Sequence, residues 1–316
     1  MSVVWNVILL GIGFVLLIKG ADIFVDASVG IAKRLKIPSV VIGLTIVAMG
    51  TSAPEAVVSV SAAIRGSNAL AIGNAVGSNL FNLLLVVGFC ALLKPISVVL
   101  KNISGDFWVS TGATVLLLGM MIVFHDAIPR SGSAVLFAAF LLYMTVLVRQ
   151  ALKHKRLDPL KTDSEALPVS LPRSILFAGL GVGIIVAGGQ LTVANAVDIA
   201  LAFGITERII GLTIVAVGTS LPELVTSIAA CKKGENDIAI GNVIGSNTFN
   251  ILLVLGASGM ILPLTVDSGL LFDVAALAAG SLIFILFART GQRVARGEGL
   301  SLVILYAAYT ALIILL

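Results

Sequence analysis

Two glutamates stand inside apolar segments of this chain, each within a copy of the same phrase. Residues 43–59 read GLTIVAMGTSAPEAVVS and residues 211–227 read GLTIVAVGTSLPELVTS, so Glu55 and Glu223 occupy matching positions. A carboxylate at the centre of a membrane helix costs about 2.5–3.5 kcal/mol on insertion scales. No Lys or Arg lies in the middle of either segment to neutralise it. We therefore predict that both carboxylates are functional and that they hold a cation.

A proline and several hydroxyl groups accompany each glutamate. Thr51, Glu55 and Ser59 recur every four residues and would share one face of a helix. Pro54 has no N–H and its ring crowds the carbonyl of Gly50, which predicts a local opening of the helix. Unpaired backbone at membrane depth is tolerated only where it is buried in protein or lines a watery cavity. The second copy repeats the pattern with Thr219, Pro222, Glu223, Ser227 and the carbonyl of Gly218.

A second polar phrase follows each of the first phrases at the same distance. It reads GNAVGSNLFNLLLVVG at 73–88 and GNVIGSNTFNILLVLG at 241–256, and both pairs of phrases are offset by 168 residues. The chain is therefore predicted to be two homologous halves in tandem. Each phrase places a polar stripe along a helix and a Gly-x-x-x-Gly that permits close helix packing. The stripes are Asn74, Ser78 and Asn82 in the first half and Asn242, Ser246 and Asn250 in the second.

Together these segments offer two carboxylates, hydroxyls, amide oxygens and freed carbonyls, without sulfur or imidazole. Hard cations prefer such ligands, and Ca²⁺ takes about 6–8 oxygens. Two glutamates carry a charge that one Ca²⁺ neutralises, and Na⁺ is hard enough to use the same oxygens.

Simpler explanations exist for most of the other polar residues. A Gly-x-x-x-Gly is usually packing alone, and Ser and Thr in such helices often bond the i−4 carbonyl. Asp22, Asp26 and Asp198 are expected to be solvated or interfacial. The thiol and imidazole side chains are those of Cys90, Cys231, His125 and His154. Their spacing does not match a zinc site, and neither histidine is placed to act as the base of a serine hydrolase.

Composition places these phrases in a membrane protein. Hydrophobic residues make up 59% of the chain, charged residues only 11%, and soluble domains run near 25% charged. Mean hydropathy is +1.14. A spanning helix needs about 20 apolar residues, and we predict about ten such segments in an all-α polytopic fold. They lie near 3–22, 38–64, 70–93, 105–124, 131–151, 174–194, 207–230, 237–262, 268–288 and 299–316.

Five spans per half turn the second half upside down relative to the first. The predicted units are a first five-helix repeat at 1–151, a cytoplasmic linker at 152–173 and a second five-helix repeat at 174–316. Inverted repeats are typical of secondary transporters, with the substrate site at the repeat interface. Positive residues favour the cytoplasm, which predicts an inner-membrane protein with a cytoplasmic central loop and both termini outside. That side holds Lys33, Arg34, Lys36, Lys94, Lys101, the 149–173 cluster, Lys232, Lys233, Arg289, Arg293 and Arg296, against Arg65, Arg130 and Arg208 on the other.

The motif G-T-S-x-P-E followed by G-N-x-x-G-S-N-x-x-N, present twice, resembles the alpha repeats of the sodium/calcium exchanger family, in its compact prokaryotic form. The resemblance covers essentially the whole chain. It implies ten helices, of which two bundles of four enclose the ion sites while the first and sixth slide across them. The implied ligands are Thr51, Ser52, Glu55, Ser78 and Asn82, then Thr219, Ser220, Glu223, Ser246 and Asn250, with backbone carbonyls of Ala48 and Ala216.

We expect an antiporter that exchanges sodium for calcium by alternating access, not an enzyme. No cofactor and no nucleic acid is expected, and the partners are the two ions and the bilayer, with a monomer as the functional unit. Alternatives are a proton- or potassium-coupled divalent cation antiporter, a passive cation channel and, ranked last, an intramembrane enzyme using Ser78 or Thr51. Potassium-dependent relatives carry Asp where this chain has Asn250, and proton-coupled ones carry Glu at Gly77 and Gly245, so the resemblance favours sodium.

Overall fold

The computed structural model describes residues 3–66, 68–98, 100–157, 170–204, 216–266, 268–289 and 291–315. The chain is helical nearly throughout. The first half contains α1 (Val3–Leu35), α2 (Ser39–Ile42), η1 (Gly43–Val47), α3 (Ala48–Thr51), α4 (Ala53–Ile64), α5 (Asn68–Leu80), η2 (Phe81–Val86), α6 (Val87–Leu93), β1 (Ile96–Ser97), α7 (Leu100–Phe124), β2 (Ala127–Ile128) and α8 (Arg130–Leu157). The second half contains α9 (Leu171–Ala202), α11 (Ala216–Thr219), α12 (Leu221–Lys232), α13 (Asn236–Phe249), η4 (Asn250–Leu255), α14 (Gly256–Ile261), β3 (Leu264–Thr265), α15 (Ser268–Arg289), β4 (Arg293–Val294) and α16 (Arg296–Leu315).

These helices form a multi-pass membrane protein. Seven described helices are long and apolar enough to cross a membrane, or eight if the bent pair Ser39–Thr51 and Ala53–Ile64 counts as one span. The other two predicted spans are α12, which α11 precedes at the edge of the described region, and α16, which is 20 residues long. The architecture is therefore consistent with ten spans.

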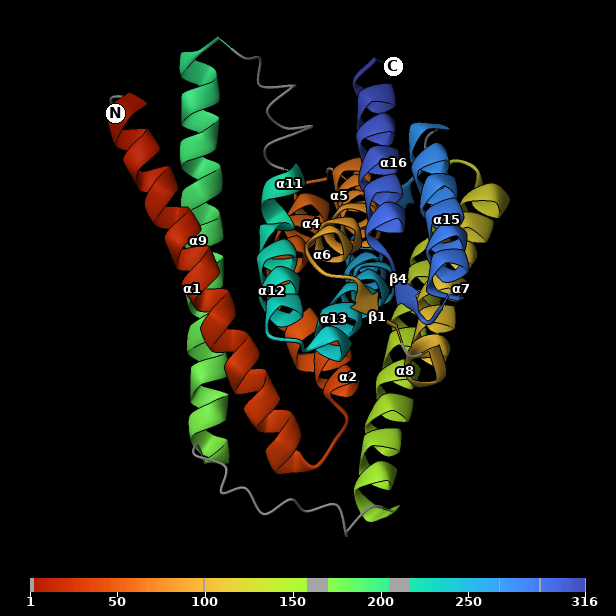
Figure 1. Cartoon of the computed structure of the whole chain (residues 1–316). Helices are drawn as coiled ribbons and strands as arrows, with labels where there is room; N and C mark the ends of the chain where they lie inside the picture. The colour runs from red at the N-terminus through yellow and green to blue at the C-terminus, as the bar shows by residue number, and fades with distance from the viewer. Residues whose placement is uncertain are drawn as a thin grey trace.

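Helices α1 and α9 lie side by side along one edge of the molecule, beside the bundle formed by the other helices (Figure 1). Both termini lie at one end, and the C-terminal end of α8 and the start of α9 lie at the other (Figure 1). At 1.5 Å per residue, the 33 residues of α1 extend about 50 Å, more than a bilayer core requires. The two helix ends that flank the predicted linker, Leu157 and Leu171, therefore lie at the end of the molecule opposite to the chain termini.

Several predicted boundaries were wrong. The first and sixth spans were expected at 3–22 and 174–194, but α1 continues to Leu35 and α9 runs from Leu171 to Ala202. The helices also enter both ends of the expected linker 152–173, since α8 continues to Leu157. Hydropathy marks only the part of a helix that lipid surrounds, so it misses polar ends that continue into water. Residues 205–215, which hold the start of the seventh predicted span and Arg208, lie outside the described region.

Two small ribbons in the part of the chain that the structure describes tie the halves together, and neither was predicted. Strand β1 pairs with β4, and β2 pairs with β3, each antiparallel over two residue pairs. The 168-residue offset relates β1 to β3, yet each ribbon joins one loop from each half. Equivalent loops therefore exchange partners, which is the pattern that a two-fold relation between the halves requires.

The break that carries the glutamates is formed in the same way in both halves. Helix α3 ends at Thr51, α4 begins at Ala53, and the two are bent by 50°. Ser52 sits at the break with φ −83° and ψ 7°, and Ser220 has φ −91° and ψ 4°. Proline occupies the first turn of α4 and of α12, where its missing N–H costs no helical hydrogen bond. Each glutamate thus lies in the first turn of a new helix.

Three π-helical segments within the described residues adjoin the polar phrases, and none was predicted from the sequence. Segment η1 precedes Ala48, while Asn82 lies within η2 and Asn250 begins η4. A π turn widens the helix by one residue per turn and occurs most often at functional sites. The π-helical segments therefore influence the direction in which the side chains of Asn82 and Asn250 point from their helices.

Close helix packing by the second Gly-x-x-x-Gly is confirmed. A Cβ on Gly241 would lie 3.0 Å from Gly43 Cα, and a Cβ on Gly245 would lie 2.7 Å from Leu44 O and from Ala48 Cβ. These approaches press α13 against η1 and α3. The equivalent partner of Gly73 and Gly77 is residues 211–216 by the repeat offset, and most of that segment is outside the described region.

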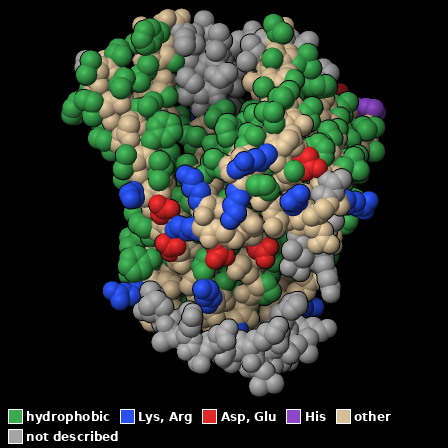
Figure 2. Space-filling view, viewed as in Figure 1, with side chains coloured by type: hydrophobic (Ala, Val, Ile, Leu, Met, Phe, Trp, Pro, Cys, Tyr) green, Lys and Arg blue, Asp and Glu red, His purple; other side chains and the backbone are tan. Residues whose placement is uncertain are grey.

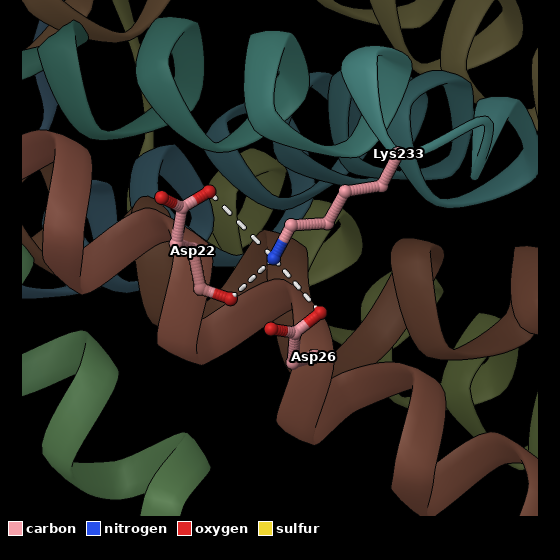
Figure 3. A network of polar contacts seen from close by, with 3 residues as sticks. All are labelled: Asp22, Asp26 and Lys233. Atoms are coloured by element: carbon pink, nitrogen blue, oxygen red, sulfur yellow. Dashed lines mark hydrogen bonds and ion pairs between the residues drawn. The ribbon is translucent and has the colours of Figure 1, made fainter.

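Charged side chains gather over part of the surface and leave the rest apolar. Figure 2 shows a hydrophobic upper region and a band of Lys, Arg, Asp and Glu across the middle of one face. Close to α1, Lys233 Nζ lies 2.8 Å from Asp26 Oδ1 and 3.6 Å from Asp22 Oδ1, and it donates to Asp22 O at 2.8 Å (Figure 3). Asp22 and Asp26 are therefore exposed in part and paired with Lys233, and Asp198 is exposed.

We expect Lys233→Ala to lower the stability by less than about 1 kcal/mol. The carboxylates of Asp22 and Asp26 are 44% and 71% exposed, and water screens ion pairs of this kind. Thermal unfolding in detergent at low and at high salt measures the effect, because screening should shrink the difference between variant and parent. A loss of several kcal/mol that salt leaves unchanged would contradict this assignment.

Candidate ion-binding site

The two glutamates are buried at the centre of the bundle and are bonded crosswise between the halves. Neither side chain has any exposed surface. Ser52 Oγ donates to Glu223 Oε1 at 2.9 Å, and Ser220 Oγ lies 3.1 Å from Glu55 Oε1. Each helix break thus supplies a carboxylate to its own half and a hydroxyl to the other. The result is one shared cluster of polar side chains rather than two separate ones.

Serines of the second phrase complete the surroundings of the carboxylates. Ser78 Oγ lies 3.4 Å from Glu55 Oε1 and 2.9 Å from Ser220 Oγ. Ser246, its equivalent, lies against Glu223. Helices α5 and α13 therefore bring their polar stripes to the same place as the two breaks.

The two threonines lie one step further out and contact asparagines of the opposite half. Thr51 Oγ1 is 3.0 Å from Asn242 Oδ1 and 3.1 Å from the Val47 carbonyl. Thr219 Oγ1 is 3.4 Å from Asn74 Oδ1. The expected i−4 bond is thus present at Thr51, together with a contact that crosses between the halves.

Asn74 and Asn242 hold this outer layer together. Asn74 Nδ2 donates to Ser59 Oγ at 2.9 Å, and Asn242 Nδ2 donates to Ser227 Oγ at 3.0 Å. Both asparagines belong to the predicted polar stripes, but neither was predicted to be a ligand. Their side-chain oxygens face the threonine hydroxyls, so the asparagines help to hold Thr51 and Thr219 in position.

The two backbone carbonyls stand at the helix breaks. Ala48 O accepts a hydrogen bond from Ser52 N at 2.9 Å and lies 3.3 Å from Thr51 Oγ1. A carbonyl oxygen has two lone pairs and can still face a cation. Ala216 begins α11; its side chain is outside the described part of the chain.

Several oxygens of the site residues are buried and have no hydrogen-bond partner within the described structure. A buried polar atom without a partner costs about 1–3 kcal/mol, and more if it is charged. Such atoms are therefore rare unless something else satisfies them. The unpartnered atoms of the site are Glu55 Oε2, Glu223 Oε2, Asn82 Oδ1, Asn250 Oδ1 and Ser246 Oγ. All are hard oxygens drawn from both halves, and a cation is the group that would satisfy them together.

The structure adds two asparagines that the sequence analysis did not select. Asn79 and Asn247 follow Ser78 and Ser246 in the phrase and are almost completely buried. Both exchange hydrogen bonds across the halves. Both belong to the repeated sequence G-S-N, which could have indicated them. They were not selected because they lie one position away from the residues that recur every four positions.

The structure also brings together two cysteines that are far apart in the sequence. Cys90 on α6 and Cys231 on α12 are both buried and free, and their thiols lie within hydrogen-bonding reach. They are not part of the site.

Comparisons with known proteins show the family to which the chain belongs. The family model for sodium/calcium exchanger protein matches residues 5–149 and 173–315. The chain is 34% identical to the sodium/calcium exchanger MaX1 of Methanosarcina acetivorans over 96% of its length and 97% of that protein. It is 37% identical to the inner membrane protein YrbG of Escherichia coli over 93% of its length and 92% of that protein.

A solved structure shares the whole fold. The sodium-calcium exchanger NCX_Mj, soaked with zero Na⁺ and Ca²⁺, matches with a TM-score of 0.86 and 32% identity, over 99% of this chain and all of that one. The family match covers both halves, and the buried oxygens lie where the halves meet. This chain belongs to the sodium/calcium exchanger family and is a multi-pass cation/calcium antiporter of the membrane, not an enzyme.

Proposed function

We propose that this protein exchanges sodium for calcium by alternating access, at a single site between the two repeats. The observation that carries the proposal is the set of buried, unpartnered oxygens contributed by both halves. The proposed ligands are those that the family resemblance implies: side chains of Thr51, Ser52, Glu55, Ser78 and Asn82, of Thr219, Ser220, Glu223, Ser246 and Asn250, and the carbonyls of Ala48 and Ala216.

Charge explains why the two ions would compete. Glu55 and Glu223 together carry two negative charges in a region without exposed surface, where an uncompensated charge is costly. One Ca²⁺ or two Na⁺ would neutralise them. Because both ions need the same carboxylates, binding of one displaces the other, which couples the two fluxes.

The same charge would prevent the empty protein from changing sides. A ligand shifts a conformational equilibrium only by binding one state better than another. We propose that the dianionic site resists the occluded state until a cation neutralises it. Transport would then be exchange rather than leak.

Sodium coupling is supported by the resemblance and by the named relatives. MaX1 and NCX_Mj are called sodium/calcium exchangers, and the chain aligns with nearly the whole of each. The neutral amide at Asn250, and glycine at positions 77 and 245, are further features that favour sodium over potassium or protons. The proposed location is the cytoplasmic membrane, with the central linker inside and both termini outside.

Flux into proteoliposomes under defined gradients tests the function. With radioactive calcium outside, an outward sodium gradient should drive accumulation, and an equal potassium or proton gradient should not. Accumulation driven by protons or potassium without sodium would contradict sodium coupling. Flux that needs no counter-ion at all would contradict exchange and favour a channel.

Ion binding should also stabilise the purified protein. A ligand that binds only the folded state adds about 2.7 kcal/mol at a concentration 100 times its dissociation constant. We expect Ca²⁺ to raise the thermal unfolding temperature in detergent, and Na⁺ to reverse that rise at constant ionic strength by competition. A calcium shift that choline and sodium reduce equally would contradict a shared site.

A further inference from the structure

The side chains of Asn79 and Asn247 form a closed pair across the two halves. Asn79 Nδ2 donates to Asn247 O at 3.0 Å, and Asn247 Nδ2 donates to Asn79 O at 3.2 Å. Both acceptors are backbone carbonyls, which present only oxygen. The donors must therefore be the amide nitrogens, and the orientation of both side chains is determined.

The remaining oxygens of this pair accept from the ligand asparagines, again crosswise. Asn250 Nδ2 donates to Asn79 Oδ1 at 3.0 Å, and Asn82 Nδ2 donates to Asn247 Oδ1 at 3.3 Å. If Asn79 were turned over, its oxygen would face a backbone oxygen and its nitrogen would face the nitrogen of Asn250. Both contacts would be repulsive. The backbone carbonyl of Asn247 therefore fixes the orientation of the Asn79 amide, and Asn79 in turn fixes that of the Asn250 amide.

The orientation of the Asn82 and Asn250 amides decides which of their atoms remains available to an ion. With their nitrogens engaged, Asn82 and Asn250 leave Oδ1 buried and, among the described residues, without a partner. The two halves of an amide have nearly the same size, and only their hydrogen bonds select which one points where. A flipped amide would present an NH₂ group, which repels a cation.

We propose that Asn79 and Asn247 are positioning residues that make the carbonyl oxygens, rather than the NH₂ groups, of Asn250 and Asn82 face the transported ion. The proposal rests on the proposed function. It also explains the crosswise pattern, because each half orients the ligand of the other and so neither ligand set is complete alone.

A double-mutant cycle separates this role from simple packing. We expect Asn79→Ala to weaken Ca²⁺ binding about tenfold in the parent, since losing one acceptor costs roughly one hydrogen bond to a buried group. In the Asn250→Asp background the same change should cost less than about threefold, because a carboxylate presents oxygen whichever way it turns. Ca²⁺ affinity is measured by calorimetry, and unfolding temperature is measured without ions for all four proteins.

The symmetric cycle, Asn247→Ala with Asn82→Asp, provides a second measurement if the first set folds poorly. Asn195→Ala is the matched control, since Asn195 is a buried asparagine of α9 whose Nδ2 donates to Leu191 O within the same helix. It should leave Ca²⁺ affinity unchanged. Equal losses of affinity in the parent and in the Asn250→Asp background, or an effect on ion-free stability alone, would overturn the proposal. If the parent binds neither Ca²⁺ nor Na⁺, the proposed function fails as well, and the two failures are thereby distinguished.

Discussion

Sodium-driven calcium uptake should fall by about 100-fold or more in Glu55→Gln and in Glu223→Gln. Removing one partner of a buried pair of opposite charges, here one carboxylate opposite the bound cation, costs about 3–5 kcal/mol, and about 1.4 kcal/mol corresponds to a factor of ten. Glutamine keeps the size of the side chain and its carbonyl oxygen, so the change isolates the charge. Uptake of radioactive calcium into proteoliposomes with an outward sodium gradient measures it.

Glu235→Gln is the matched control for this pair. Glu235 lies at the start of α13, is partly exposed, and contributes only its backbone to hydrogen bonds among the described residues. Its uptake should equal that of the parent. Parent-like uptake in both Glu55→Gln and Glu223→Gln would refute the shared carboxylate site.

The second large effect is expected from Gly245→Leu, which should prevent the folded state from forming. A Cβ at this position would already lie 2.7 Å from the backbone oxygen of Leu44 and from Ala48 Cβ. Overpacking a filled interior by even a few carbons costs about 1–3 kcal/mol, and here a rigid backbone atom stands in the way. Size-exclusion chromatography in mild detergent should show aggregated instead of monodisperse protein.

Gly183→Leu supplies the contrast. Gly183 is an exposed glycine of α9, and nothing lies within 4 Å of the Cβ that a side chain would add. This variant should elute as the parent does and transport calcium normally. If Gly245→Leu behaved in the same way, the close approach of α13 to η1 and α3 would not be required for folding.

Much of the architecture was readable from local pattern. Long apolar segments predict spans because lipid offers no partner to backbone groups, so each span must satisfy its own. The repeated phrases predicted two related halves, and Pro54 predicted the break near Glu55 because proline acts within one turn. The π-helical segments were not predictable in this way, since their extra residue depends on packing between helices. The true ends of α1 and α9 were missed because hydropathy marks only the part of a helix that lipid surrounds.

The candidate site was only partly visible from the residues alone. Glu55 and Glu223 stood out because a carboxylate is costly in an apolar segment wherever its neighbours lie. Asn79 and Asn247 did not stand out, since an asparagine near a membrane helix has many uses and spacing along one helix cannot name a partner 168 residues away. The contact between Cys90 and Cys231 was hidden for the same reason.

The sequence by itself determined the chemical type of the polar groups inside the apolar segments, the duplication and the multi-pass membrane architecture. These follow from side-chain solvation and from backbone hydrogen bonding, which act residue by residue. The tertiary structure decided that each half completes the other, with Ser52 bonded to Glu223 and Ser220 to Glu55. It also decided which oxygens of the described residues are left without partners, because that depends on every donor brought nearby by folding.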